Sequence, residues 1–414
     1  MKIERSSSGS PGNESVLRQK PFALYLSARA AATIAFQIQA VAVSWQMYAL
    51  TGSALYLGLV GLAQFLPMFV LTLPVGHAAD RYDRRSIVLL CQLVEALATL
   101  LLAAACFTGR LGKESLLVIV AIIGAARAFE GPSMQSLMPA LVAPELFPRA
   151  AAWSASAFQV ASIVGPALGG LLYAASPTVV FAVAAFLYLG SSLLVSLIKL
   201  GAALQRRESA TLGSIFAGIT FIRGKQVILG AISLDLFAVL LGGATALLPI
   251  YAKDILFTGS LGLGILRSAP AAGALAMSLF LARRPLNRRV GRTMFIAVAI
   301  FGLATILFAV SKSFALSLFA LVVLGAADVI SVVVRQSLVQ LQTPDEMRGR
   351  VSAVNSMFIG TSNQLGEFES GLTASWFGTV PAVLIGGIGT LVVVALWVRL
   401  FPQLARADRI EKAP

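Results

Sequence analysis

Charged side chains are scarce in this sequence: Asp, Glu, Lys and Arg together make up 12% of its 414 residues, where about 25% is usual in a soluble domain. Hydrophobic residues account for 58%. A water-soluble fold does not explain this surplus, whereas a lipid bilayer does, because each helix that crosses it needs ~20 mostly apolar residues. The composition therefore predicts an all-α integral membrane protein.

Cysteine and histidine are nearly absent, which excludes most metal and disulfide chemistry. Cys91 and Cys106 are the two cysteines, and they fall in one apolar run, ~22 Å apart along a helix. That separation is too large for a disulfide. His77 is the single histidine, so the ligands of a closed zinc site are missing. We therefore expect two packing cysteines, no metal and no other cofactor.

The sequence also lacks the features of an ATP-driven pump or an enzyme. Gly112-Lys113 and Gly224-Lys225 have neither the upstream Gly nor the following Ser or Thr of a phosphate-binding loop. An integral-membrane acyl or glycosyl transferase would need a His/Asp or paired-carboxylate cluster at one membrane interface, and the single His lies outside any such cluster. We do not expect an enzyme, and a transferase remains the alternative of a different class.

Apolar runs bounded by charge, Gly or Pro predict twelve transmembrane helices in two bundles. The first six cover 22–50, 54–75, 86–107, 115–137, 151–174 and 178–200. The second six cover 227–251, 260–282, 293–310, 313–334, 351–375 and 381–400. We expect bundles at 22–200 and 227–400, a disordered cytoplasmic tail at 1–21, a cytoplasmic linker with an amphipathic second part at 201–226, and a cytoplasmic tail at 401–414.

The basic residues are distributed between the apolar runs rather than gathered on one arm, which argues against nucleic-acid binding despite the net charge of +14. Of the 32 Lys and Arg residues, 24 fall on the side that carries both tails, and four fall in the opposite loops. Lys and Arg accumulate in short cytoplasmic loops. The pattern predicts a plasma (inner) membrane protein with both termini in the cytoplasm.

The two halves of the chain share a weak internal repeat. Gly124-Ala125-Ala126 recurs as Gly325-Ala326-Ala327, and Gln135-Ser136-Leu137 recurs as Gln336-Ser337-Leu338, both at an offset of 201. Duplicated halves around a central site are typical of secondary transporters.

One loop between the second and third predicted helices concentrates charge in a short turn. It reads Gly76-His-Ala-Ala-Asp80-Arg81-Tyr-Asp-Arg84-Arg85. Arginine clusters bind carboxylates through paired hydrogen bonds, so such a loop can hold two helix ends together in one conformation and release them in another. The alternative is that these charges only set the topology.

On this loop the chain resembles the major facilitator superfamily, whose pattern here is G-x-x-x-D-R/K-x-G-R/K-R/K. Gly76, Asp80, Arg81, Arg84 and Arg85 match, while Asp83 stands where the family has Gly. The resemblance implies that the five matching residues form a conformational latch. Arg127-Ala-Phe-Glu130-Gly131-Pro132 further resembles the branch that contains the enterobactin and macrolide efflux carriers.

A glycine-rich segment of the fifth predicted helix resembles the antiporter motif of exporting members. Gly165, Pro166, Gly169 and Gly170 match its G-P-x-x-G-G part, while Ala161 stands at its leading Gly. Small residues four apart also let helices approach closely, so a packing seam is a compatible second interpretation.

Ionisable residues inside the spans are functional candidates, because each costs about 3 kcal/mol to insert. The predicted spans, or in the case of Arg335 the residue directly after one, include Arg29, Glu95, Arg127, Glu130, Asp235, Arg267, Asp328, Arg335, Glu367 and Glu369. Arg127 and Glu130 are neighbours on one helix face. Asp328 occupies the repeat position of Arg127, so we expect these two residues to face each other across the central cavity. The alternative for each residue is a static ion pair or a position near the membrane interface.

These observations predict a secondary transporter whose two bundles rock about a central site. We expect Glu130, Asp235 and Asp328 to carry protons, and Arg29, Arg127 and Arg267 to contact anions or act as counter-charges. The expected activity is export of a small molecule, such as a drug-like compound, a siderophore or a related metabolite, in exchange for protons, by a monomer. A lipid translocator or an importer of the same fold are the alternatives.

Overall fold

The computed structural model describes residues 16–71, 82–199, 212–284, 286 and 288–408, and within them the chain is helical with no β-strand. The long helices α1, α2 and α4 to α7 form the first half of the chain. Their bounds are Lys20–Thr51 (α1), Ala54–Val70 (α2), Arg84–Phe107 (α4), Lys113–Leu137 (α5), Phe147–Ala175 (α6) and Pro177–Ser196 (α7). Short 3₁₀ turns precede α1 (Val16–Arg18) and connect α5 to α6 (Met138–Ala140 and Pro144–Leu146).

The second half begins with α8, which joins the two sets of helices. Its elements are Leu212–Gly224 (α8), Gln226–Leu241 (α9), Gly259–Arg283 (α11), Val290–Val310 (α12), Phe314–Gln342 (α13), Asp345–Phe377 (α14), Thr379–Leu400 (α15) and Pro402–Arg406 (α16). Most of these helices begin and end within a few residues of the predicted spans. The exceptions are α6, α13 and α14, which are longer, and α2, α7 and α9, which end earlier. The helical fold class is thereby confirmed.

The span predicted at 227–251 is not one helix. After α9 the chain continues as a 3₁₀ turn (Ala244–Leu247), a short α10 (Leu248–Ile250) and a π-helical turn (Tyr251–Ile255). A Cβ atom on Gly243 would lie 2.2 Å from the carbonyl oxygen of Gly366 on α14, so the helix breaks where its backbone touches a neighbour. Pro249 then removes one backbone donor.

Ten helices among the described residues are long and apolar enough to cross a membrane. The remaining two of the twelve predicted spans coincide with α2 and α14. The described part of α2 has 17 residues, and its predicted span runs on to 75, beyond the described segment. α14 is long but carries many polar side chains. The count of twelve therefore remains a prediction for these two.

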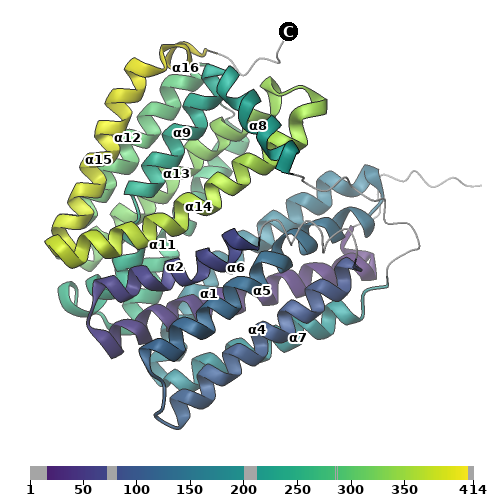
Figure 1. Cartoon of the computed structure of the whole chain (residues 1–414), viewed down its shortest axis with the longest axis vertical. Coiled ribbons are helices and arrows are strands. Elements are labelled where there is room, and N and C mark those ends of the chain that lie inside the picture. The colour runs from purple at the N-terminus through teal and green to yellow at the C-terminus, as the bar shows by residue number, and fades with distance from the viewer. Residues whose placement is uncertain (1–15, 72–81, 200–211, 285, 287, 409–414) are drawn as a thin grey trace, which may run out of the picture.

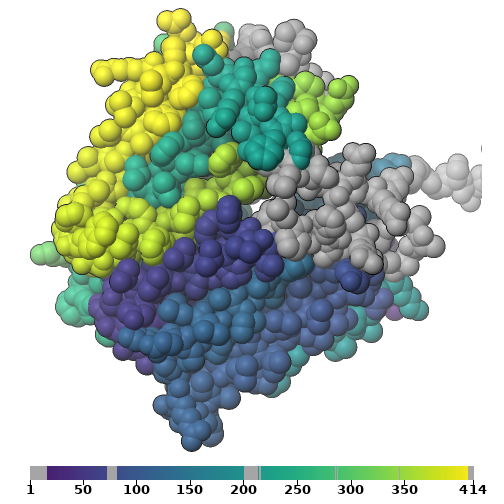
Figure 2. Space-filling view, in the orientation of Figure 1, coloured from purple at the N-terminus to yellow at the C-terminus, as the bar shows by residue number. Residues whose placement is uncertain are grey.

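Each half forms its own packed set of helices, and the two sets meet along two helix pairs. In the first half α4 packs on α5 and α7, and α1 packs on α6 and α7; in the second, α12 packs on α13 and α15, and α11 packs on α13. α2 contacts α14 and α6 contacts α11 between the halves. Figure 1 shows the two sets touching along one side and diverging towards α8, and Figure 2 shows the same contact in space-filling form.

Candidate functional site

The two halves are in close contact where α1 ends and α2 begins. A Cβ atom on Gly170 of α6 would lie 2.4 Å from the carbonyl oxygen of Ser260 on α11, and one on Gly371 of α14 would lie 2.6 Å from the backbone of Gly58 on α2. The hydroxyl of Ser260 donates to the carbonyl of Gly170 at 3.2 Å. This end of the molecule is closed by backbone packing that tolerates no side chain.

A polar contact reinforces the closed end. The Tyr48 hydroxyl at the end of α1 donates to the carboxylate of Asp254 in the π-helical turn of the other half. The ammonium group of Lys253 lies 5.2 Å from the centre of the Tyr48 ring. The aromatic ring therefore stands between a carboxylate and a cation, both from the second half.

The glycines of the antiporter-like motif lie at close helix contacts. A Cβ atom on Gly165 would lie 2.5 Å from the Cβ of Gln37, and one on Gly169 would lie 2.9 Å from the carbonyl oxygen of Ile38. Both contacts are to α1. Pro166 and Gly170 instead face α11, since a Cβ atom on Gly264 would meet the carbonyl oxygen of Pro166 at 2.5 Å. The packing interpretation of the motif describes this geometry, and its role in antiport stays a prediction.

The opposite end of the first half is hollow. One hollow of about 500 Å³ lies between α1, the end of α5 and the beginning of α6, and its lining includes Arg29, Gln135, Phe147 and Ser154. A second, of about 150 Å³, lies deeper and is lined by Arg29, Arg127, Glu130 and Gln135 among others. We call them the outer hollow and the inner hollow. Arg29 and Gln135 line both.

Two residues that line the inner hollow, Arg127 and Glu130, belong with the buried Gln92 and Glu95 of α4 to a group that we call the amino-terminal charge cluster. Arg127 and Glu130 lie 3.9 Å apart, nitrogen to oxygen. Gln92 of α4 donates to the carboxylate of Glu130 at 3.0 Å, and the Arg127 guanidinium lies 3.5 Å from the centre of the Phe36 ring. Arg127 thus has a carboxylate and an aromatic face as partners, as its spacing from Glu130 predicted.

Glu95 is the most unusual member of this cluster. Its side chain is fully buried, and neither carboxylate oxygen has a hydrogen-bond partner. Buried polar groups are normally satisfied. The sequence placed Glu95 in a span but gave no reason to rank it above the others. Gln92 and Glu95 are three residues apart on α4. This spacing puts both on the helix face turned towards Glu130 and could have identified them.

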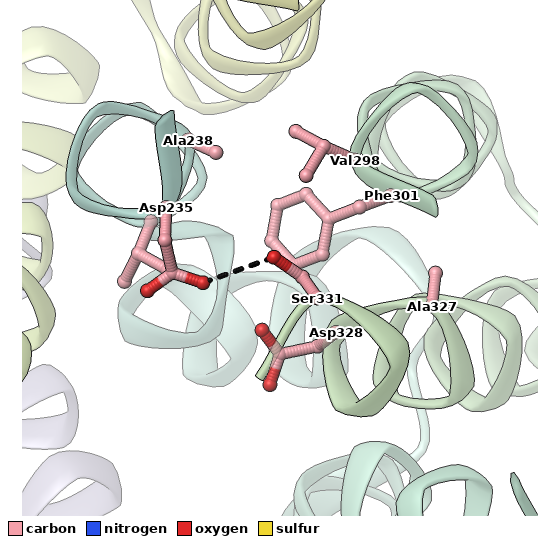
Figure 3. A pocket seen from close by; sticks show the side chains of 8 residues that line it. Asp235, Ala238, Val298, Phe301, Ala327, Asp328 and Ser331 are labelled. Atoms are coloured by element: carbon pink, nitrogen blue, oxygen red, sulfur yellow. Dashed lines mark hydrogen bonds between the residues drawn. The ribbon is translucent and has the colours of Figure 1, made fainter. Parts of the chain in front are cut away.

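The second half contains a more tightly paired group, the carboxy-terminal charge cluster: Asp235, Asp328, Ser331, Arg335 and Asn355. Arg335 and Asp235 lie 3.3 Å apart, nitrogen to oxygen. Arg335 donates to the side-chain oxygen of Asn355 at 2.8 Å, and Ser331 donates to Asp235 at 3.2 Å. Figure 3 shows Asp235 and Asp328 approaching one small cavity from α9 and α13, with the ring of Phe301 beside them.

Sequence reasoning missed the partner of Asp235. Arg335 was counted among the charges within spans but assigned no role. A lone Asp in an apolar run needs a counter-charge, and Arg335 lies one helical turn from Ser331. We also expected Arg127 and Asp328 to face each other across the centre; in the described part of the chain the ion-pair partner of Arg127 is Glu130, within its own half.

Two further charges lie between the halves. A Cβ atom on Gly61 of α2 would lie 3.0 Å from a carboxylate oxygen of Glu367 on α14, which places Glu367 against the first half. Arg267 of α11 interacts with it electrostatically, although they form no ion pair within 4 Å. Arg267 is therefore close to a carboxylate rather than isolated.

The loop expected to act as a latch lies mostly outside the described residues, since Gly76, Asp80 and Arg81 belong to the part that is not described. Asp83, which replaces the Gly of the family pattern, is the N-cap of α4. Its carboxylate accepts from the backbone N–H of Ser86 at 3.1 Å, and its φ is −62°. Any residue adopts that value, so the position does not require Gly.

The two described arginines of this loop bind helix ends within the first half. Arg84 donates to the carbonyl of Ser136 at 3.4 Å, and Arg85 donates to the carbonyl of Ser196. They join the beginning of α4 to the ends of α5 and α7. Cations near helix C-termini are favourable, so these contacts stabilise this end of the first half.

Comparison with known proteins gives full-length relatives. Residues 12–414 match the family described as transmembrane secretion effectors. An MFS-type transporter, YvqJ of Bacillus subtilis (strain 168), is 26% identical over 357 residues, which is 83% of each chain. The enterobactin exporter EntS of Escherichia coli O81 (strain ED1a) is 25% identical over 401 residues, which is 95% of each chain.

Solved structures share the fold at lower identity. A bacterial homologue of the iron transporter ferroportin, in an inward-facing state, superposes with a TM-score of 0.70 at 17% identity, covering 95% of this chain and 100% of that one. A bacterial homologue of the human lysosomal transporter Spinster, inward-facing and occupied, gives 0.74 at 13% identity, with 95% and 98% covered.

The helical fold, the paired halves and the full-length family match agree with one another, and the relatives are transporters rather than enzymes. The chain is a multi-pass membrane transporter of small molecules, and it belongs to the major facilitator superfamily in the family of transmembrane secretion effectors.

Proposed function

We propose that this protein exports a small organic molecule from a bacterial cytoplasm in exchange for protons. The observation that carries the proposal is the asymmetry of the two ends: one is sealed by Gly170, Ser260 and their neighbours, while hollows open at the other and reach Arg127 and Glu130. A carrier that alternates between two such states moves its substrate across the bilayer. The enterobactin exporter among its relatives supports export as the direction.

In the proposed orientation both termini lie in the cytoplasm, because 24 of the 32 basic residues fall on that side. The hollow end carries the beginnings of α1 and α6, so in this orientation the hollows open to the cytoplasm. We take the transporter to be a monomer. The units that rock are the bundles at 22–200 and 227–400. Fusions of a fluorescent protein and of alkaline phosphatase to each end test the orientation; active phosphatase at either end contradicts it.

Glu130 is the proton carrier that we favour. It lines the inner hollow, its counter-charge Arg127 is 3.9 Å away, and Gln92 holds one of its oxygens. Glu130 would bind a proton and the hollow would bind substrate in alternation, so that Glu130 loses its proton to the cytoplasm before the substrate binds and is protonated again after the substrate is released outside. Asp235 and Asp328 are the second candidates, although the tight pairing of Asp235 with Arg335 favours a structural role. The proposed conformational latch would hold helix ends together in one transport state and release them in the other. Its residues are Gly76, Asp80, Arg81, Arg84 and Arg85.

The test uses inside-out membrane vesicles energised to an acidic interior and a fluorescent reporter of the pH gradient. Enterobactin and erythromycin serve as probes. We expect one of them to dissipate the gradient in the parent protein, Glu130→Gln to abolish this, and Glu145→Gln, an exposed residue of the turn before α6, to leave it intact. Asp235→Asn is measured beside them.

Three other results would each contradict one part of the proposal. Probe uptake without any gradient removes proton antiport. Gradient-driven transport that persists in Glu130→Gln removes Glu130 from the mechanism. Accumulation of the probe in right-side-out vesicles makes the protein an importer.

A further inference from the structure

The outer hollow is lined in part by polar groups whose hydrogen-bonding capacity is not fully used within the protein. It lies between α1, the end of α5 with the turn that follows, and the first two turns of α6. Its volume of about 500 Å³ is in the range of small-molecule sites, ~300–1,000 Å³. The hollow is open on one side, at the end of the molecule where the two halves diverge.

Arg29 supplies a guanidinium group with unused donors. An arginine carries five N–H donors, and Arg29 uses one of them on the hydroxyl of Tyr25 at 3.0 Å. No carboxylate of the described residues lies within ion-pair distance of it. Arg127, one hollow deeper, has Glu130 and the Phe36 ring as partners, whereas no described residue provides Arg29 with a counter-charge.

Ser154 provides a second, independent observation on another helix. Its side chain lines the outer hollow and is only 3% exposed, yet its hydroxyl has no hydrogen-bond partner. A serine inside a helix ordinarily donates to the carbonyl one turn earlier. Here the hydroxyl forms no such bond, and buried hydroxyls without a partner are unfavourable. Rotation of this short side chain towards the hollow would let a ligand atom satisfy it.

The rest of the lining is mainly apolar. It consists of Pro132, Met138, Pro139, Phe147, Ala151 and Ala155, together with the polar Gln135 and Ser136. Such a wall favours an apolar body, while a guanidinium binds carboxylates and phosphates through paired hydrogen bonds. The chemistry of the hollow fits an amphipathic organic anion.

We propose that Arg29 and Ser154 form a binding subsite for the anionic head of an amphipathic organic acid, whose apolar part rests on the α5–α6 wall of the outer hollow. The proposal rests on the proposed function in one respect, namely that the acid is the transported molecule. Arg29 also lines the inner hollow, so the anion can pass from Arg29 to Arg127 as it moves from the outer hollow to the inner hollow.

The test measures equilibrium binding to the purified full-length protein in dodecyl maltoside micelles, by calorimetry and without any gradient. The probes are 1-naphthoate and 1-naphthamide, which share a ring system and differ in charge. We expect the acid to bind at least about tenfold more tightly than the amide, since a hydrogen bond to a charged group contributes about one to two powers of ten in affinity.

The variants separate the two residues. Arg29→Gln should weaken naphthoate binding about 10- to 100-fold and change naphthamide binding less than about twofold. Arg29→Lys should retain part of the affinity, and Ser154→Ala should lower that for naphthoate about two- to tenfold. Arg110→Gln, an exposed cation in the loop between α4 and α5, is the charge-matched control and should bind like the parent.

The proposal is overturned if acid and amide bind equally, if neither binds, or if Arg29→Gln binds naphthoate like the parent. If Arg29→Gln does not fold, the test relies on Ser154→Ala. Equal losses of affinity for naphthoate and naphthamide in that variant would overturn the subsite. Displacement of naphthoate by phosphatidylglycerol but not by phosphatidylcholine would identify a lipid headgroup as the ligand and overturn a soluble cargo.

The two proposals fail separately. If naphthoate binds through Arg29 but energised vesicles show no gradient-dependent transport, the subsite stands and the proposed function falls. If vesicles exchange protons for erythromycin while naphthoate does not bind the purified protein, the function stands and the subsite falls.

Discussion

The two charge clusters occupy corresponding places in the two halves, yet they differ in how tightly their ion pairs are held and in how exposed they are. In the carboxy-terminal charge cluster Arg335 and Asp235 are 3.3 Å apart, and the Arg335 side chain is 2% exposed. In the amino-terminal charge cluster Arg127 and Glu130 are 3.9 Å apart, and the Arg127 side chain is 33% exposed. One pair is sealed within the helices, while the other opens onto a hollow.

The internal repeat explains how this difference arose on one scaffold. At the offset of 201, Arg127 corresponds to Asp328, Glu130 to Ser331 and Met134 to Arg335. The arginine of the second half therefore sits two helical turns further along its helix, where α9 and α14 cover it. Each cluster contains two carboxylates and one arginine. In the first half Arg127 and Glu130 line a hollow of about 150 Å³, whereas the cavity beside Asp235 and Asp328 measures only about 10 Å³.

Arg335→Met should produce the largest effect. The change leaves Asp235 buried without its counter-charge, and breaking a buried ion pair costs about 3–5 kcal/mol. We expect a large drop in the thermal unfolding midpoint and in the yield of monodisperse protein in detergent, measured by fluorescence-detected gel filtration.

The matched change in the other half is Arg127→Met, for which the loss should be smaller, about 1 kcal/mol, because solvent reaches this pair. Addition of Asp235→Asn to Arg335→Met should recover part of the stability. Equal losses for the two arginines, or no recovery in the double variant, would show that the clusters do not differ in this way.

A second prediction concerns the glycines of the repeat. A Cβ atom on Gly325 would lie 1.9 Å from the carbonyl oxygen of Pro270, and one on Gly124 would lie 2.6 Å from that of Gln64. Both are backbone contacts within one half, between α5 and α2 in the first and between the equivalent α13 and α11 in the second. Gly325→Ala should therefore destabilise the protein by about 3 kcal/mol and Gly124→Ala by about 1 kcal/mol. The thermal midpoints of the two variants provide the ranking, and the reverse order would contradict it.

A third prediction separates stability from transport in the first half. Gln92→Ala removes the donor to Glu130, and a hydrogen bond to a charged group contributes about 1.5–3 kcal/mol. Because Glu130 lines a hollow, water can replace the amide, so the loss should stay near 1 kcal/mol. Transport in the energised vesicles should fall further than stability does. Asn355→Ala is the counterpart at Arg335, where burial denies water access, and its loss of stability should be the larger of the two.

Much of the fold followed from the sequence because apolar length and loop charge are strong signals. α1, α4, α5 and α12 begin within three residues of the predicted spans, and the Gly124 and Gly325 motifs make the same kind of interhelical contact. The break after α9 did not follow, because it depends on the approach of Gly366 from a helix more than a hundred residues away.

The candidate site followed only in part. The spacing of Arg127 and Glu130 predicted their contact, since residues three apart share a helix face. The pairing of Asp235 with Arg335 and the unsatisfied hydroxyl of Ser154 did not follow, because they depend on how α6, α9 and α13 rotate about their axes. Helices that are apolar on most sides give little periodic signal for that rotation.

The smallest effect is expected at Gly131, beside Glu130 on α5. No atom lies within 4 Å of a Cβ atom added there, and Ala is more favourable than Gly inside a helix by about 0.5–1 kcal/mol. Gly131→Ala should therefore raise the thermal midpoint slightly. Its counterpart in the repeat is Val332, which already carries a side chain. If transport falls in Gly131→Ala while stability rises, the first half needs a flexible helix next to its accessible cluster, which would sharpen the contrast with the second half. A lower midpoint would instead mean that α5 packs against a neighbour at this point in another state of the cycle.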